Sequence, residues 1–205
     1  MTDKPPSYRV ALAALAAVVA LVFAALLFER SRTPVLHGAV IDPPQAMPDI
    51  VLEAGDGPMQ LSSFDGKYVI LVFGYTTCPD VCPITLAALQ SAISELDPEV
   101  ASRFQVVFVS VDYRRDSPMQ VSRYARSFRP DFVGATGSEM EIAQVARDYG
   151  IYYKLNEPDP ESGFYTVEHT ASVLVLDPQR RLIMTWPYGL QAEELSRDLR
   201  LLAAS

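Results

Sequence analysis

Apolar residues are distributed along this chain in two different ways. The run from Val10 to Phe28 holds 19 residues without a charge. In a helix, which rises about 1.5 Å per residue, such a run approaches the roughly 30 Å hydrocarbon core of a bilayer. After residue 65, short continuous apolar runs alternate with segments in which apolar residues recur at helical spacing. This alternation predicts strands followed by helices in an α/β domain.

The N-terminal run is predicted to be a transmembrane anchor over residues 10–28, after a short tail over residues 1–9. A cleaved signal peptide is the main alternative, but its apolar core usually has about 7–15 residues and ends at small residues. The run here is longer and ends in Phe28-Glu29-Arg30, which is a poor cleavage site. Basic residues lie on both sides of the run, so charge alone does not orient it.

Residues 29–48 are predicted to be a linker, and residues 49–205 a single folded domain. Four prolines stiffen the segment 33–48, and no periodic pattern is present there. His37 falls in this segment, and we expect its side chain to be solvated.

The domain shows the element order of a thioredoxin-like fold. Predicted strands cover 69–73, 104–111, 132–135, 171–176 and 182–186, and predicted helices cover 86–96, 118–128, 138–149 and 195–202. Ser117 and Ser138 are expected as N-caps, and Gly150 as a helix stop. Residues 151–167 interrupt the alternation and are expected to form an inserted hairpin or a long excursion. A βαβ unit followed by a ββα unit places helices on both faces of a mixed sheet.

Composition and charge exclude several classes of protein. The net charge is −8, and because residues 1–32 carry +2, the remainder carries −10. An acidic domain without a Lys/Arg cluster argues against nucleic acid as a partner. The hydrophobic fraction of 49% argues against disorder over most of the chain, and two cysteines are too few for a disulfide scaffold.

Both cysteines lie in the turn after the first predicted strand of the alternation. The sequence Cys78-Pro79-Asp80-Val81-Cys82-Pro83 has C-x-x-x-C spacing. Positions i and i+4 of a helical turn share one face, with Cβ atoms about 5–6 Å apart. A helix N-terminus favours thiolates. The motif therefore supports either a metal ion or a reversible disulfide.

His169 is the third candidate, since it precedes a strand expected beside the first one. Soft thiolates select copper(I), zinc or iron–sulfur clusters. Structural zinc normally has four protein ligands, and iron–sulfur clusters usually have four cysteines. A three-coordinate Cys78, Cys82 and His169 set fits one copper(I) per chain. With a water or weak oxygen donor, the same set fits copper(II).

Two motifs resemble the signatures of the Sco/SenC family of copper metallochaperones. They are Cys-Pro-Asp-Val-Cys-Pro (78–83) and Val-Glu-His-Thr (167–170). The segments 73–75, 110–112 and 115–118 are similar to the family as well, and the resemblance covers roughly residues 38–203 together with the N-terminal anchor. One departure is Glu168, where the family usually has Asp.

The resemblance implies a thioredoxin fold that binds copper and helps assemble the binuclear copper centre of cytochrome c oxidase. Cys78, Cys82 and His169 occupy the family's copper-ligand positions. The implied partner is the copper-centre subunit of the oxidase, with another copper chaperone or a thioredoxin-like reductase as further candidates. The anchor and the exposed dithiol favour a bacterial inner membrane, with the domain in the periplasm.

Two other functions stay open at this point. A thiol–disulfide oxidoreductase would use Cys78 as the attacking and Cys82 as the resolving thiol, and would keep cysteines of an oxidase subunit or copper protein reduced. An interaction domain with a structural disulfide is disfavoured, because so short a loop stabilises little by chain entropy. We favour a metallochaperone over an enzyme.

Several other residues have roles that the sequence leaves divided. Asp80 could tune the metal, contact a partner or favour the turn, and Asp112 is expected as a cap or turn residue more than an electrostatic one. Tyr75 and Tyr152 are candidates to shield the site, although aromatic packing is the default. The acidic stretch 157–161 is expected as a solvated loop or a docking surface.

Overall fold

The computed structural model describes residues 7–30 and 36–204, which fall into two units divided between residues 35 and 36. The first unit holds helix α1 (Ser7–Arg30), whose described side chains, 10–24, are all exposed. Within the described part of the chain, no helix has both the length and the apolar character needed to cross a bilayer. Most of the predicted tail, residues 1–9, and the side chains at 25–28 lie outside the described residues.

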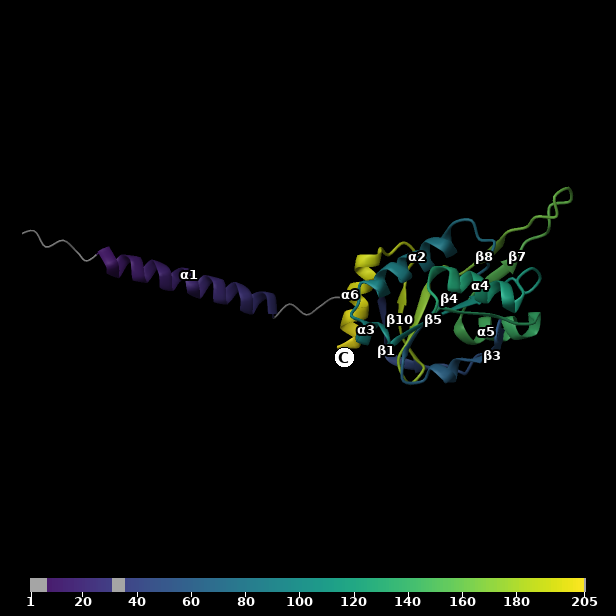
Figure 1. Cartoon of the computed structure of the whole chain (residues 1–205), viewed down its shortest axis with the longest axis horizontal. Coiled ribbons are helices and arrows are strands. Elements are labelled where there is room, and N and C mark those ends of the chain that lie inside the picture. Colours follow the sequence, from purple (N-terminus) through teal and green to yellow (C-terminus); the bar gives the residue numbers. More distant parts are fainter. Residues whose placement is uncertain (1–6, 31–35, 205) are drawn as a thin grey trace, which may run out of the picture. The chain divides into compact units, whose positions relative to one another are not determined.

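The second unit is built on an eight-stranded mixed sheet in the order β1-β10-β9-β4-β5-β6-β2-β3 (Figure 1). Central β4 pairs parallel with β5 and antiparallel with β9. The elements run β1 (Ala39–Ala46), β2 (Val51–Ala54), β3 (Gly57–Gln60), η1 (Leu61–Phe64), β4 (Tyr68–Gly74), α2 (Val81–Ser94), α3 (Pro98–Ala101), β5 (Phe104–Ser110), α4 (Pro118–Phe128), β6 (Val133–Thr136), α5 (Glu139–Tyr149), β7 (Tyr153–Leu155), β8 (Val167–His169), β9 (Val173–Leu176), β10 (Arg181–Trp186) and α6 (Ala192–Ala203). This confirms the thioredoxin-like α/β arrangement that the element order predicted.

Both faces of the sheet are covered. One hydrophobic core joins the sheet to α2, α4 and α6, and the other joins it to η1 and α5. Strand β4 contributes to both cores, since Ile70 and Val72 point into the first while Leu71 and Phe73 point into the second. Alternate side chains of a strand face opposite sides, so a strand covered on both faces is apolar throughout. That is the reason for the continuous run at 69–73.

The helix boundaries follow the capping signals in the sequence. Ser117 and Ser138 each accept a hydrogen bond from the backbone N–H three residues later, and both form complete capping boxes. Gly150 ends α5 in the left-handed conformation, with a φ of 66°. A left-handed residue after a helix favours glycine, because glycine has no Cβ. These three predictions are confirmed.

The segment expected as a proline-rich stalk contains a strand. β1 pairs antiparallel with β10 at the edge of the sheet, with an irregularity between Val40 and Gln45 that takes in Pro43 and Pro44. Proline lacks the N–H that a ladder needs, so it is tolerated only at edges and bulges. Because the prolines fall in this irregular part of the ladder, the segment shows no strand periodicity in the sequence.

His37 is not a free stalk residue. Its backbone N–H and its ring Nδ1 both bond the carboxylate of Asp198 in α6, the ring at 2.9 Å. Asp198 is fully buried and also accepts the indole N–H of Trp186 at 2.8 Å. The expectation of a solvated side chain was wrong, because the partner lies far along the chain in α6 and no local pattern predicts it.

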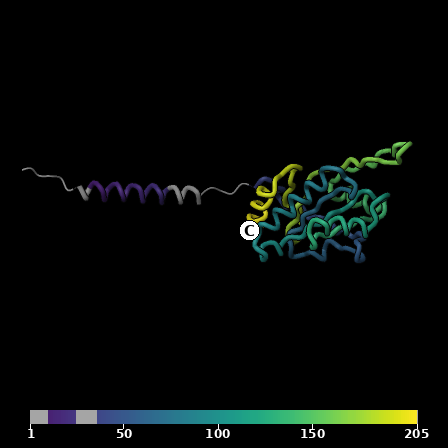
Figure 2. Tube along the Cα trace, turned by 45° about the horizontal axis from the view of Figure 1, so that its top comes forward, coloured from purple at the N-terminus to yellow at the C-terminus, as the bar shows by residue number. Residues whose placement is uncertain are grey.

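The inserted segment forms a hairpin, as predicted. Strands β7 and β8 pair antiparallel as a separate two-stranded sheet, with Tyr153 opposite His169. The loop between them extends away from the rest of the unit (Figures 1 and 2). The short ladder therefore places His169 by direct pairing, and the ends of the insertion, including Ile151, Tyr165 and Val167, are buried in the core.

Candidate metal centre

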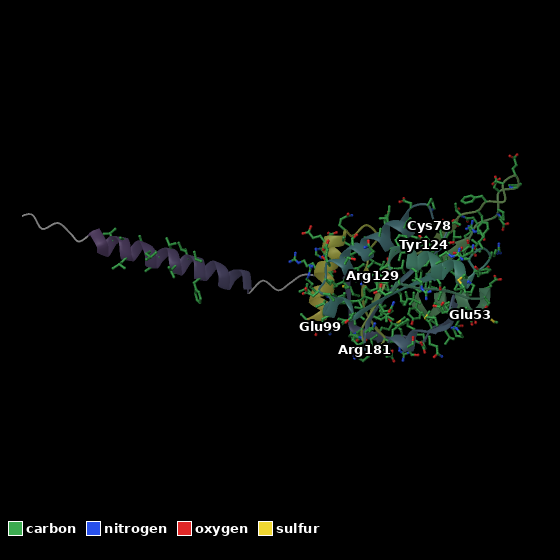
Figure 3. The ribbon with its side chains drawn as sticks, viewed as in Figure 1. Glu53, Cys78, Glu99, Tyr124, Arg129 and Arg181 are labelled. Carbon is green, nitrogen blue, oxygen red and sulfur yellow. The ribbon has the colours of Figure 1, made fainter. Side chains whose placement is uncertain are left out.

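The two cysteines lie where β4 passes into α2. Cys78 precedes the helix and is half-buried, whereas Cys82 lies in its first turn and is 1% exposed. Both are free thiols, and the N–H of Cys78 bonds the carbonyl of Tyr75 at 3.2 Å. Cys78 lies at the opposite end of the sheet from Arg181 (Figure 3). The carboxyl ends of parallel strands are the usual ligand-binding edge of an α/β sheet.

Gly74, the last residue of β4, makes room for the buried thiol. A Cβ at this position would lie 2.4 Å from Sγ of Cys82 and 3.0 Å from the ring of Phe108. At the first of these distances the thiol or the strand would have to shift. The glycine therefore accommodates the close approach of the thiol to the backbone.

His169 reaches the cysteines from the end of β8. Its Nε2 lies 3.7 Å from Sγ of Cys82, and its Nδ1 lies 3.0 Å from the carbonyl oxygen of Thr170. A carbonyl can only accept, so Nδ1 carries the proton and the lone pair of Nε2 faces the sulfur. The ring of Tyr75 packs edge-on against the imidazole, with centroids 5.9 Å apart.

The three donor atoms of Cys78, Cys82 and His169 all lie within 4.8 Å of one another. No other group of three His, Cys, Asp or Glu side chains in the described residues meets this criterion. Thiolate and imidazole ligands bind borderline and soft metals at about 2.0–2.3 Å, so three donors around one ion are separated by roughly 3.5–4 Å. The cluster fits a three-coordinate soft ion with little adjustment.

The protonation of these ligands follows from their burial. Burial raises the pKa of the Cys82 thiol, and the neighbouring Cys78 raises it further. Burial lowers the pKa of His169, although its hydrogen bond to Thr170 opposes this effect. The imidazole is thus neutral and able to coordinate at neutral pH. The Cys82 thiol must release its proton to solvent when a metal binds.

Asp116 holds the start of the dithiol loop. Its carboxylate is almost fully buried and accepts the backbone N–H of Thr76 at 2.8 Å and the Thr76 hydroxyl at 2.6 Å. The hydroxyl of Ser110 bonds the same carboxylate. Sequence reasoning assigned Asp116 no role. Its position in the segment 115–118, which is similar to the family, was the signal that could have singled it out.

Asp112 fastens the inserted segment that leads to His169. It is fully buried, accepts the Tyr165 hydroxyl at 2.7 Å and forms an ion pair with Arg115. The guanidinium of Arg115 lies 3.6 Å from the centroid of the Tyr165 ring and bonds the Tyr165 carbonyl at 2.9 Å. Asp112 also accepts backbone bonds from the turn that follows. Asp112 is therefore a turn residue, as expected, and its charged side chain also holds Tyr165 and Arg115 in place.

The remaining predicted residues divide between the site and the surface. Tyr75 is buried against His169, whereas Tyr152 is 57% exposed. Asp80 is exposed at the N-cap of α2, and its side chain makes no capping bond. The acidic residues 157, 159 and 161 are exposed in the loop between β7 and β8. Of the two tyrosines, only Tyr75 packs on the imidazole.

Comparison with known proteins places this geometry in a family. The SCO1/SenC family model matches residues 50–204. An apo Sco1 protein from Thermus thermophilus superposes with a TM-score of 0.75 at 38% identity, covering 85% of this chain and 99% of that one. ScoI of Bradyrhizobium japonicum, solved with copper bound, superposes with a TM-score of 0.68 at 31% identity, covering 77% of this chain and 99% of that one.

A curated relative shows the same likeness over a shorter part of its length. The mitochondrial SCO2 homolog of Bos taurus is 34% identical over 140 residues, which are 68% of this chain and 52% of the relative. The chain thus spans about half the length of this relative. Because the family match extends over most of the folded unit, this chain belongs to the SCO1/SenC family.

Proposed function

We propose that this chain is a membrane-anchored copper metallochaperone. Cys78, Cys82 and His169 would hold one copper ion and pass it to the copper-centre subunit of cytochrome c oxidase. The observation that carries the proposal is the convergence of two sulfur atoms and one imidazole nitrogen within 4.8 Å. Copper in the related ScoI structure supports the choice of metal, and the resemblance to the Sco/SenC family implies the oxidase as the client.

The difference in exposure between the cysteines suits transfer of the metal. Soft thiolates favour copper(I), and the neutral imidazole of His169 adds a nitrogen donor suited to either oxidation state. Cys78 is half-buried and Cys82 is buried, so an incoming thiolate reaches the ion from the side of Cys78. Stepwise replacement of ligands then releases copper without exposing it to water.

Copper binding is tested by an anaerobic copper(I) titration of the reduced full chain in detergent, against a chromophoric chelator. We expect one copper per chain. Copper affinity should fall by more than about 100-fold in Cys78→Ser and Cys82→Ser, because losing a ligand costs more than losing a hydrogen-bond partner of a ligand. His169→Ala weakens copper(II) binding most. His37→Ala removes the other histidine and is the matched control. Unchanged binding in His169→Ala would refute the three-ligand site.

A thiol–disulfide oxidoreductase is the second candidate, favoured by the same contrast in exposure. The Cys78 thiolate attacks a client disulfide, forms a mixed disulfide and releases one client thiol. The Cys82 thiolate then attacks Cys78 and releases the second thiol, so the client gains two electrons and Cys78–Cys82 becomes a disulfide. His169 takes no part. This function would be favoured if the unchanged chain bound no copper and His169→Ala kept full turnover of the client disulfide.

We also propose that residues 10–28 anchor the protein in a bacterial inner membrane, with the folded unit in the periplasm. The run of 19 uncharged residues supports an anchor. The test is extraction of membranes with alkaline carbonate, which releases peripheral proteins. We expect the full chain to stay in the pellet and a Leu15→Arg/Val19→Arg variant to be released. Release of the unchanged chain would refute the anchor.

A further inference from the structure

A groove beside the metal centre has a character unlike the rest of this acidic chain. We call it the tyrosine–cation groove. Its volume is about 410 Å³, and it lies between α5, the turn after β5 and the β7–β8 hairpin. Its polar lining consists of three tyrosines and three cations: Tyr113, Arg114, Arg147, Tyr152, Tyr153 and Lys154.

The three cations of the groove lack a direct ion pair among the described residues, although two carboxylates lie at its margin. Arg114, Arg147 and Lys154 make no ion pair with a carboxylate among the described residues, and no described carboxylate lines the groove. Glu139, which bonds the Tyr113 hydroxyl, and Glu168, which lies across from Lys154, are at its margin. The whole chain carries −8 and repels acidic groups at long range, so only a local cationic hollow such as this one attracts them.

The groove is joined to the metal centre through the hairpin backbone. Tyr153 pairs directly with His169, and the N–H of Tyr152 bonds the Thr170 hydroxyl at 3.0 Å. The N–H of Thr170 returns a bond to the Tyr152 carbonyl at 2.9 Å. A segment seated in the groove therefore lies against β7, the strand that pairs with the one holding the imidazole ligand.

We propose that the tyrosine–cation groove binds an acidic segment of the protein that exchanges copper with the site. This inference rests on the proposed function, because it assumes an exchange partner. Tyrosine and arginine are the residues most enriched at protein interfaces, since they bury a large area and keep a polar contact. Exposed Tyr152 supplies such a contact on the hairpin side of the groove. Charge complementarity then brings the partner's ligands to the half-buried Cys78.

The test uses fluorescent eight-residue peptides of glutamate, glutamine and lysine, with the reduced full chain in detergent. Fluorescence anisotropy at low salt should show binding of the glutamate peptide alone. The affinity should fall steeply as salt rises to about 0.2 M, where charges are screened beyond roughly 8 Å. Arg147→Glu/Lys154→Glu should weaken binding by about tenfold or more. Arg123→Glu/Arg197→Glu, on exposed positions of α4 and α6 away from the groove, is the matched control.

Equal weakening in both double variants would overturn the proposal, because binding would then follow net charge alone. Absence of binding by the unchanged chain would overturn it as well. A dimer that disappears in Glu157→Gln/Glu161→Gln would assign the groove to the acidic loop of a second copy instead. Copper(I) affinity, measured separately, should be unchanged in Arg147→Glu/Lys154→Glu. Absence of copper binding by the unchanged chain would refute the proposed function without affecting the peptide result.

Discussion

Cys82 Sγ and His169 Nε2 lie 3.7 Å apart, although 87 residues separate them in the chain. Cys82 is carried by the helix that follows β4, and His169 ends the hairpin that leads into β9. Because β9 pairs antiparallel with β4, the chain enters β9 at the edge where β4 ends. The pairing of these two strands brings the sulfur and the nitrogen together.

Replacing Gly74 should damage the metal centre without touching a ligand. In Gly74→Ala the new methyl meets Cys82 Sγ, so either the thiol or the strand must shift. We expect a loss of about 1–3 kcal/mol in the free energy of unfolding, together with weaker copper binding. Urea unfolding and the chelator titration measure the two effects. Thr77→Ala, at an exposed position of the same loop, should change neither. Native copper affinity in Gly74→Ala would contradict the proposed packing.

The two cysteines should differ in reactivity. Cys78 is half-buried, whereas Cys82 is buried and has a raised pKa caused first by burial and then by Cys78. The thiolate is the reactive form, so iodoacetamide at pH 8 should modify Cys78 faster by about tenfold or more. Mass spectrometry of timed digests measures both rates. In urea the difference should vanish. Faster labelling of Cys82 in the native state would reverse the assigned order of attack.

Asp116 should act as a positioning residue for the dithiol loop. Asp116→Asn keeps the size of the side chain but removes the charge that accepts the two bonds from Thr76. Loss of an outer partner of this kind costs about 10–100-fold in metal affinity. We expect that loss in the chelator titration, with the alkylation rate of Cys78 altered as well. Asp97→Asn, an exposed carboxylate without a capping bond, is the control. A purely structural role would lower stability and leave the metal affinity of the folded protein unchanged.

The lowered pKa of His169 has a definite consequence for stability. Burial disfavours the imidazolium, so the folded state takes up this proton at lower pH than the unfolded state does. As pH falls below about 6.5, the unfolded chain binds more protons and the metal-free protein loses stability. NMR titration of the imidazole should give a midpoint below that found in urea. The pH dependence should be smaller in His169→Ala. A native midpoint at or above the unfolded value would contradict the burial.

Local patterns were sufficient for most elements of the fold. Ser117 and Ser138 cap their helices and Gly150 ends one, because capping depends on residues within a single turn. The strands buried on both faces were visible as apolar runs. The edge strand β1 was not, since its prolines lie at an irregularity in the ladder and its side chains are mostly exposed. An edge strand with mostly exposed side chains lacks the alternation of apolar and polar residues that would predict it.

The sequence by itself determined the ligand types, their spacing in one turn and the order of the elements. These depend on chemistry and on neighbours within a few positions. Only the tertiary structure decided that Nε2 rather than Nδ1 of His169 faces Cys82, and that Asp116 holds the loop. It also decided that Asp112 binds Tyr165, that His37 binds Asp198, and that Arg114, Arg147 and Lys154 gather in one groove. Such contacts join residues far apart in the chain, and strand pairing and burial select their partners.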